Sequence, residues 1–561
     1  MDMVQFSKRH WKKVAVGFTG ILLVVIGAAW YTGYHWRREL QHQLHSYVLQ
    51  MTDSLYSLQY ASMDLDILGG DLTLHKISLV PDTARYHHLQ EQQRARPFYC
   101  AVAADKIDLQ GFSAWQYFRE KKIVASALVF TAPALVMHVD TRTKDTSAPR
   151  SFYQAMSRQL KEIRIGRLQL LNTNMLYTFD RPGAKQMSMQ VNKLDIRVED
   201  LLVDSVAQRD PTRYLYSSNF TIDLKDYKYR SKDSMYWMKV HELHYNAAAQ
   251  TLRIDSFHLE PMYDYAEFDK HLHFQNDRFN IRFNQVRIHG CDPYSLMEGN
   301  LLARSMHVGS GMVHVYHNRN LPEDPKPKYG KHPNQVLARL GVPLQLDTMI
   351  AKEIDVQYRE VSPKTGETGV LDFKHASGVL TNITNIDTSL KKDNQLVVRL
   401  HALLMGQGDL SARFDFPIND SAGAFRLSGV LKNLDGRRMN PIVRPLNRIE
   451  IAALQVHSLA FNMSGNQYRA AGTVDFKYDS LKVTFLQQKE DTKHAKRSGL
   501  ATFLANAFGL KNNSPDKGVV PAAAIVEMDR DPHKSFFNLV WKTIFKGIKQ
   551  TAGSGLLKSI T

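Results

Sequence analysis

The sequence predicts a mainly β protein in which one N-terminal transmembrane helix precedes a long, largely antiparallel sheet. Three observations predict it: an uncharged N-terminal run, two-residue alternation of apolar and polar residues through most of the remaining chain, and few helical stretches. The 561 residues are 43% hydrophobic and 10% aromatic, which excludes an intrinsically disordered chain. Two cysteines exclude a disulfide-stapled mini-protein and a Cys-ligated zinc protein, and whether Cys100 and Cys291 pair stays open.

Residues 14–34 contain no charged side chain and, as a helix, would span about 30 Å, the thickness of the hydrocarbon core of a bilayer. Four basic residues precede this run within residues 1–13. The positive-inside rule therefore places residues 1–13 in the cytoplasm and the bulk of the chain across the membrane. A cleaved signal peptide ending at Gly27-Ala28-Ala29 is the alternative, but the length of the run favours an uncleaved anchor.

A helical neck is expected over residues 35–60, and strand-like alternation follows it. One face of each strand is apolar and the other polar, which is typical of antiparallel rather than buried parallel sheets. The apolar positions are candidates for a lipid-contacting face: Leu72, Leu74, Ile196, Val198, Ile222, Leu224, Ile281, Phe283, Phe414, Phe416, Val483 and Phe485.

Helices are expected to be few and short. The candidates are residues 151–162, 295–305, 333–341, 498–509 and 533–550. This is too little helix to cover so long a sheet, so its apolar face must meet another sheet, curl on itself or face an apolar phase that is not protein. A set of dry β-sandwiches would show the same alternation, and the pattern alone does not separate it from an open groove.

A weak internal repeat links residues 106–140 to residues 287–317. Both copies contain a basic residue, an isoleucine, a glycine (Gly111 or Gly290), a short helical stretch and an alternating strand that ends near His-Val. A repeated strand module indicates a sheet that extends along one axis. The proline-rich, charged segment 318–334 predicts a loop or linker between an N-terminal part of the sheet, 61–317, and a C-terminal part, 335–490.

The C-terminal region, residues 491–561, contains the expected amphipathic helix 533–550. Its apolar face comprises Phe537, Val540, Trp541, Ile544, Phe545 and Ile548, and lysines lie opposite. Such a helix either lies in a membrane interface or caps the end of the sheet, and both interpretations remain open.

The anchor, the pattern of residues 60–140 (including KIDLQGFSAW and KKIVASALVFTAPALVMHVD) and the stretch 435–550 resemble the AsmA-like proteins of Bacteroidetes-type bacteria. That family belongs with TamB and the chorein-type bridge-like lipid-transfer proteins. The resemblance implies a long, curved sheet forming a U-shaped, taco-like apolar groove. It also implies phospholipid passage across the periplasm or maintenance of the cell envelope. It carries no catalytic motif to this chain.

No pattern in the sequence indicates catalysis. Neither GxGxxG, GxxxxGK[ST] nor GxSxG occurs, and the 23 histidines do not fall at metal-ligand spacing, so we expect no enzyme, cofactor or metal site. The formal net charge of +17 is spread along the chain. Beyond a membrane, anionic lipid headgroups are better partners for it than nucleic acid.

We therefore expect a single-pass inner-membrane protein whose periplasmic part moves phospholipids or other envelope lipids between the inner and outer membranes, or supports outer-membrane homeostasis. Contact with the outer membrane or an outer-membrane protein would involve the C-terminal helix. The alternative is a scaffold for outer-membrane protein biogenesis, built of dry β-sandwich domains. Native mass spectrometry separates the two, because only a conduit should retain phospholipid.

Overall fold

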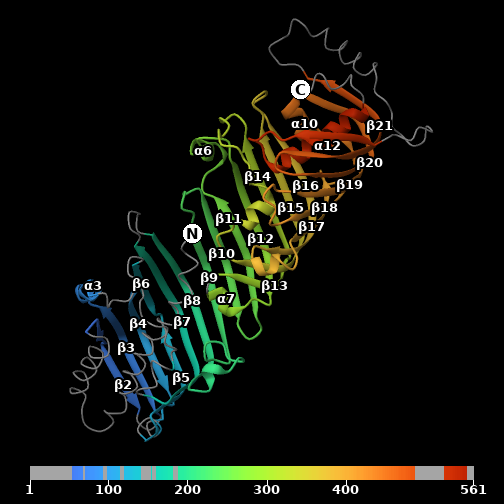
Figure 1. The fold of residues 1–561 in the computed structure, drawn as a ribbon. Helices are drawn as coiled ribbons and strands as arrows, with labels where there is room; N and C mark the ends of the chain where they lie inside the picture. Colours follow the sequence, from blue (N-terminus) through green and yellow to red (C-terminus); the bar gives the residue numbers. More distant parts are fainter. Residues whose placement is uncertain are drawn as a thin grey trace. The chain divides into compact units, whose positions relative to one another are not determined.

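The computed structural model describes residues 54–552 except 67–69, 93–97, 114–115, 117–118, 141–152, 154–159, 181–186, 298 and 487–522. The described strands belong to one 22-stranded sheet (Figure 1). Two compact units are distinguished. Unit 1 comprises Met1–Tyr229, Lys239–Asp255 and Gly290–Asn300, and unit 2 comprises Arg230–Met238, Ser256–His289 and Leu301–Thr561.

The strands, in chain order, are β1 (Tyr56–Gln59), β2 (Ser62–Asp66), β3 (Asp71–Pro81), β4 (Phe98–Gln110), β5 (Lys122–Thr131), β6 (Ala134–Asp140), β7 (Glu162–Asp180), β8 (Met187–Val203), β9 (Asn219–Arg230), β10 (Tyr236–Asn246), β11 (Thr251–Pro261), β12 (Asp277–His289), β13 (Leu301–Val308), β14 (Ser310–Asn318), β15 (Leu344–Val361), β16 (Thr368–Thr384), β17 (Gln395–Leu404), β18 (Gly408–Pro417), β19 (Phe425–Asp435), β20 (Ile449–Gly465), β21 (Arg469–Phe485) and β22 (Ala524–Asp529).

The described helices are short apart from the last one. They are α3 (Thr83–Glu91), η1 (Ala207–Arg209), α6 (Tyr265–Lys270), α7 (Pro293–Met297), α8 (Pro333–Ala338), α9 (Asp387–Leu390), η2 (Gly436–Met439), α10 (Asn440–Asn447) and α12 (Phe536–Ala552). The prediction of a mainly β, largely antiparallel fold is confirmed. Every alternating segment named above lies within a strand, namely β3, β8, β9, β12, β18 or β21.

The internal repeat corresponds to a repeated strand arrangement. In the first copy, β4 pairs antiparallel with both β5 and β6, and these two pair parallel with β7. In the second copy, β12 pairs in the same way with β13 and β14, and both pair parallel with β15. Gly111 and Gly290 both have positive φ, at 61° and 68°, which explains why each copy has glycine there.

The parallel pairs explain the long connection after each repeat. Parallel neighbours require a crossover of about a dozen residues or more, because the chain must return to the end of the sheet from which it started. After β14 the crossover is formed by residues 319–343, which include the predicted proline-rich loop and α8. Segment 318–334 does not separate the two units, since unit 2 includes the residues on both sides of it.

Several long strands contain a bulge at a non-glycine residue in the left-handed region. In unit 1 they include Asn172 on β7, Lys193 on β8 and Asp226 on β9, and in unit 2 they include Glu353 on β15 and His375 on β16. The register of β7 with β8 and of β15 with β16 shifts at these positions. All five side chains are exposed, and two pairs are joined across strands as Lys193–Asp226 and Glu353–His375. Because a bulge bends its strand, these neighbouring bulges bend adjacent strands at the same level.

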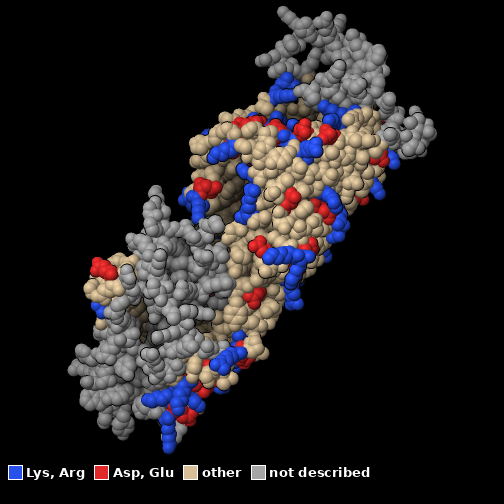
Figure 2. All heavy atoms as spheres, viewed as in Figure 1, with Lys and Arg blue, Asp and Glu red and all other residues tan. Residues whose placement is uncertain are grey.

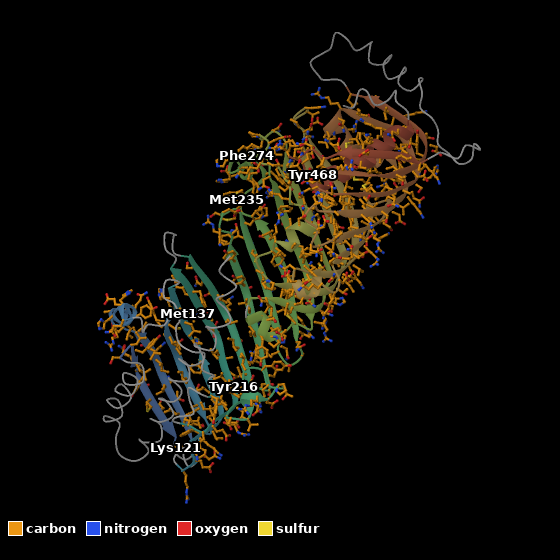
Figure 3. The ribbon with its side chains drawn as sticks, in the orientation of Figure 1. Lys121, Met137, Tyr216, Met235, Phe274 and Tyr468 are labelled. Atoms are coloured by element: carbon orange, nitrogen blue, oxygen red, sulfur yellow. The ribbon has the colours of Figure 1, made fainter. Side chains whose placement is uncertain are left out.

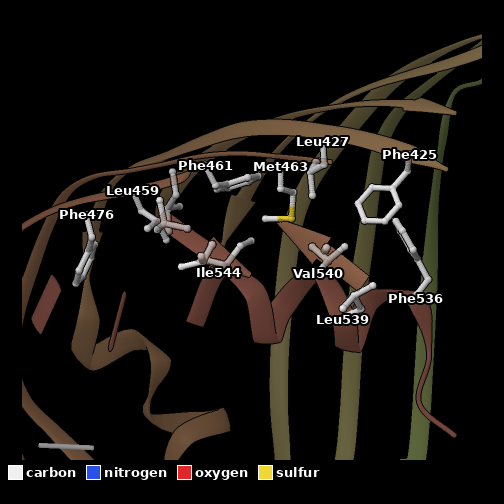
Figure 4. Packing of buried hydrophobic residues seen from close by; sticks show 14 of the residues in the cluster. Phe425, Leu427, Leu459, Phe461, Met463, Phe476, Phe536, Leu539, Val540 and Ile544 are labelled. Atoms are coloured by element: carbon white, nitrogen blue, oxygen red, sulfur yellow. The ribbon is translucent and has the colours of Figure 1, made fainter. Parts of the chain in front are cut away.

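Each unit has its own buried apolar cluster. In unit 1 the cluster comes from one face of β1 to β8, and Tyr216, labelled in Figure 3, packs against it. In unit 2 the cluster, here called the C-terminal core, comes from β17 to β22, α8 and α12. Figure 4 shows α12 lying against the apolar face of β19 and β20, with Phe536 next to Phe425 and Val540 below Met463.

Three helix predictions can be compared with the described residues. Segment 333–341 contains α8, as expected, and α12 corresponds to the expected helix 533–550. The prediction over 295–305 is wrong, since α7 ends at Met297 and β13 begins at Leu301. Residues 301–308 gain backbone partners on both β12 and β15, which outweighs their local helical pattern.

The other N-terminal and loop predictions fall mainly on residues outside the described part. Within the expected neck 35–60, residues Tyr56–Gln59 form β1 and pair with β3. The expected anchor 14–34, helix 498–509 and most of 151–162 lie outside the described residues. In the part of the chain that the structure describes, no helix combines the length and hydrophobicity needed to cross a bilayer.

Candidate functional site

An unbroken line of apolar side chains crosses five strands of unit 2. Cross-strand pairing places Ile281 (β12) beside Val313 (β14), Val313 beside Val356 (β15), Val356 beside Phe373 (β16) and Phe373 beside Leu404 (β17). These five residues are called the apolar row. A parallel line of Phe279, Val315, Tyr358 and Leu371 lies two residues further along each strand, on the same face.

Burial changes along the apolar row. Ile281, Val313, Val356 and Phe373 are half-buried, whereas Leu404 is buried and belongs to the C-terminal core. Neither buried cluster of the described residues includes a side chain from β12, β13 or β14. The apolar face is therefore covered at its β17–β22 end and partly open to solvent at Ile281, Val313 and Val356, while Phe373 on β16 lies at the boundary and packs against the C-terminal core.

The opposite face of the same strands is polar. Next to Ile281 in sequence, Arg282 is exposed, and Gln357 donates to Asp372 across β15 and β16 at 3.0 Å. Lys374 pairs with Asp355 at 3.0 Å between the same strands. In the view of Figure 2, acidic and basic side chains are interspersed over the described surface. Opposite the apolar row, the strands thus present polar and charged side chains, as the alternation predicts, apart from Tyr316, which is buried against Tyr265 of α6.

Charged pairs end the apolar row on one rim of the sheet. Four residues from Val313 on β14 and from Ile281 on β12, His317 and Asp277 pair at 2.8 Å. On β15, Glu360 accepts from the hydroxyl of Tyr358 at 2.7 Å and pairs with Arg319 at 2.9 Å. Burial and the nearby Glu360 carboxylate raise the pKa of Tyr358 well above its usual value, so this hydroxyl stays protonated. Apolar strand centres and a charged rim suit an amphipathic ligand.

The helix α12 covers the apolar face at the C-terminal end. Leu539 is 1% exposed, and Val540 and Ile544 are also buried in the C-terminal core. Phe536 begins the helix and contacts Phe414, Phe416 and Phe425 through their rings. This aromatic cluster fixes the start of α12 over β18 and β19.

The crossover segment holds the start of α12. Lys328 donates its backbone N–H to the carbonyl of Pro532, and the ring of His533 bonds to the carbonyl of Asp324 at 3.0 Å. Arg530, which is 7% exposed, donates to the carbonyl oxygens of Lys328 and Lys534. The predicted loop 318–334, which follows β14, is therefore hydrogen-bonded to the residues at the start of α12.

The predicted lipid-face residues have different environments. Leu72 and Leu74 are buried in the unit 1 cluster, Ile196 packs against that cluster, and Val198, Ile222 and Leu224 are half-buried. Ile281 and Phe283 are half-buried on the face of the apolar row. Phe416 and Val483 are buried, Phe414 packs against the C-terminal core, and the side chain of Phe485 lies outside the described part.

The predicted membrane-interface face of the C-terminal helix is divided. Val540 and Ile544 are buried against the sheet, and Ile548 packs against the same core. By contrast Phe537 is 65% exposed and Trp541 51% exposed, while Phe545 is half-buried. While α12 stays packed, only Phe537, Trp541 and Phe545 remain accessible to another molecule.

Sequence reasoning missed the middle of the apolar row. Val313, Val356 and Phe373 each lie in alternating segments, but β15 and β16 contain bulges that interrupt the two-residue period. Phe536 was also missed, because the expected helix face begins at Phe537. A search that allows one extra residue per strand would have found the row.

The described residues contain neither a metal-ligand cluster nor a disulfide. No group of three or more His, Cys, Asp or Glu side chains is placed to hold a metal ion there. Cys100 and Cys291 are both free thiols, and burial raises the pKa of Cys100 to about 12 and of Cys291 to about 11. No family model matches the chain, and no curated protein matches it.

Proposed function

We propose that the protein binds the acyl chains of phospholipids on its apolar face and acts as a conduit for them without chemistry. The observation that carries this proposal is the half-buried part of the apolar row on β12, β14 and β15, because Ile281, Val313 and Val356 belong to neither apolar cluster of the described residues and pack against neither. In a conventional core, facing side chains of a second layer would bury such a row almost completely.

The free-energy balance supports an apolar surface of this kind. Exposing an acyl chain to water costs about 0.8 kcal/mol per CH₂ group, so a lipid with two long tails does not cross an aqueous space unaided. A continuous apolar face removes most of that cost while the headgroup stays in solvent at the charged rim. Because such a surface binds a lipid with a similar free energy at each position along its length, the lipid can move along it.

The cellular setting belongs to the same proposal. We place the chain in the inner membrane through residues 14–34, with its sheet in the periplasm, where it serves phospholipid transport or outer-membrane homeostasis as the likeness to AsmA-like proteins implies. The basic excess of the chain favours anionic headgroups as partners. No step needs a catalytic residue or a cofactor.

The experiment is native mass spectrometry of the full-length chain released from detergent. We expect several phospholipids per wild-type chain and fewer with Ile281→Asp, which places a charge in the apolar row. The matched control, Arg282→Asp, changes the neighbouring exposed residue on the opposite face and should keep the wild-type lipid number. Asp at Ile222 or Phe283 extends the test to two further half-buried positions. A folded wild-type chain without lipid would reject the conduit.

The second candidate function is a lipid-free scaffold for outer-membrane protein assembly. The two buried clusters favour it, because they show that both units contain regions packed like ordinary protein cores. If Ile281→Asp unfolds the chain and no lipid copurifies with the wild type, the scaffold is the better description.

A further inference from the structure

The helix α12 presents a stripe of aromatic side chains that its packing leaves accessible. Phe537, Trp541 and Phe545 are spaced by four residues and so lie along one side of the helix. The rings of Trp541 and Phe545 stack with centroids 5.7 Å apart, and Nζ of Lys549 lies 5.1 Å from the centroid of Phe545. Phe537, Trp541 and Phe545 are together called the aromatic stripe.

Contacts around the helix fix the direction of the aromatic stripe. Lys546 donates to the carbonyl of Glu527 on β22, and Gly547 lies against Val474 on β21. Val540 and Ile544 follow on the side of β19 and β20. Successive residues of a helix are turned by about 100°, so Phe537 and Trp541 come next after Val540 and Ile544 when one moves around the helix axis in this direction. Relative to Gly547, Phe537 is then turned by about 80°, Trp541 by about 120° and Phe545 by about 160°, so the stripe begins beside the buried residues of α12 and continues onto its outer side.

Basic side chains continue the same rotation around the helix. Lys542 and Lys549 come after the aromatic stripe, on the side of α12 that is turned away from the sheet. Moving around the helix from the sheet, a ligand would therefore meet buried apolar residues, exposed aromatic rings and then ammonium groups. This order matches a lipid whose tail lies beside the sheet and whose anionic headgroup points to solvent.

We propose that the aromatic stripe binds an acyl chain of one phospholipid at the end of the apolar face, and that Lys542 and Lys549 contact its anionic headgroup. This inference rests on the proposed function and names a terminal lipid site within it. A single lipid is favoured over a membrane surface because Val540 and Ile544 are buried in the C-terminal core, which leaves α12 too narrow an apolar surface to lie in a membrane interface. Charge complementarity selects phosphatidylglycerol over the zwitterionic phosphatidylcholine.

The test uses the fluorescence of Trp541 in the full-length chain. The other five tryptophans, at positions 11, 30, 36, 115 and 237, are replaced by Phe. The detergent-solubilised protein is titrated with phosphatidylglycerol or phosphatidylcholine whose acyl chains carry bromine, which quenches tryptophan only on contact. We expect quenching that saturates at one lipid per chain, at a several-fold lower concentration for phosphatidylglycerol.

Two double variants separate the contribution of the lipid headgroup to binding from that of the acyl chain. The double variant Lys542→Glu and Lys549→Glu should remove the preference for phosphatidylglycerol while quenching by phosphatidylcholine persists. The control is the double variant Lys352→Glu and Lys432→Glu, at exposed positions on β15 and β19. It makes the same change of charge and should keep the preference for phosphatidylglycerol.

Three outcomes would overturn the inference. The first is no quenching, and the second is an equal response to both headgroups. The third is quenching that rises with the brominated fraction without saturating, which would indicate docking on a membrane surface. Native mass spectrometry of the same sample separates the two proposals: lipid bound without quenching rejects only the terminal site, whereas a lipid-free chain rejects the conduit as well.

Discussion

Nη1 of Arg530 lies 3.1 Å from Nε2 of His332, and both side chains are buried. The other ring nitrogen of His332 lies 2.8 Å from the carbonyl of Gly423, so Nδ1 donates and Nε2 accepts from the guanidinium. This pair connects the crossover segment to the start of α12. It requires a neutral imidazole, because protonation would remove the acceptor and place two cations side by side.

The His332–Arg530 pair predicts loss of stability in acid. Burial lowers the pKa of His332, and the Arg530 cation lowers it further, so the folded state binds this proton less readily than the unfolded state. The stabilising contribution is complete above the unfolded pKa of about 6.5 and is lost as the pH falls through the lower folded value. Urea unfolding at pH 7.5 and 5.0 should show a smaller pH effect for His332→Gln than for the wild type. Equal pH effects would contradict this role.

The two sides of α12 should differ in their contribution to stability. Leu539→Ala removes a side chain buried in the C-terminal core and should lower the free energy of unfolding by about 2–5 kcal/mol. Trp541→Ala removes an exposed ring and its stacking with Phe545, at a cost below about 1.5 kcal/mol. Chemical denaturation of both variants provides the measurement. A larger loss for Trp541→Ala would mean that α12 packs through its other side.

Gly429 on β19 makes room for an aromatic ring from the next strand. Gly429 pairs with Phe461, and a Cβ at Gly429 would lie 2.7 Å from Cε2 of that ring. Gly429→Val should therefore destabilise the protein by about 1–3 kcal/mol through overpacking. Ser428→Val, at the exposed neighbouring position, should stay within about 0.5 kcal/mol of the wild type. Similar thermal midpoints for the two variants would show that the ring moves aside freely.

The bulge on β15 predicts a difference between two adjacent exposed positions. Glu353 has φ of 48°, which a β-branched residue adopts only with strain, so Glu353→Val should cost about 1–3 kcal/mol. Loss of its exposed ion pair with His375 adds little. Lys352→Val, one residue earlier, should be nearly neutral. If urea midpoints show equal effects, backbone strain does not maintain the bulge.

Alternation was enough to predict the fold class and the strands, because a two-residue period is a direct consequence of strand geometry. Ile281 and Phe283 were placed correctly in a strand for this reason. The pairing of the strands could not be predicted from the sequence. The parallel pairing of β13 with β15 depends on the path of the crossover segment, and that path is set by long-range contacts such as the hydrogen bond of Lys328 with Pro532.

The candidate site was harder to predict because local pattern does not report what covers an apolar face. Leu72 and Ile281 have similar sequence surroundings, yet Leu72 is buried in a cluster and Ile281 is half-buried. In the same way, helical periodicity grouped Val540 with Trp541, although tertiary packing buries one and exposes the other. Periodicity identifies an apolar surface, but only long-range packing decides whether protein or another phase covers it.

The most direct test of the conduit compares two adjacent positions on β15 by photo-cross-linking in living cells with labelled phospholipid. A photoreactive amino acid at Val356 lies in the apolar row, whereas one at Gln357 lies on the opposite, polar face beside Asp372. We predict lipid adducts at position 356 and none above background at position 357. Equal labelling at both positions, or none at 356 in a folded chain, would contradict the conduit.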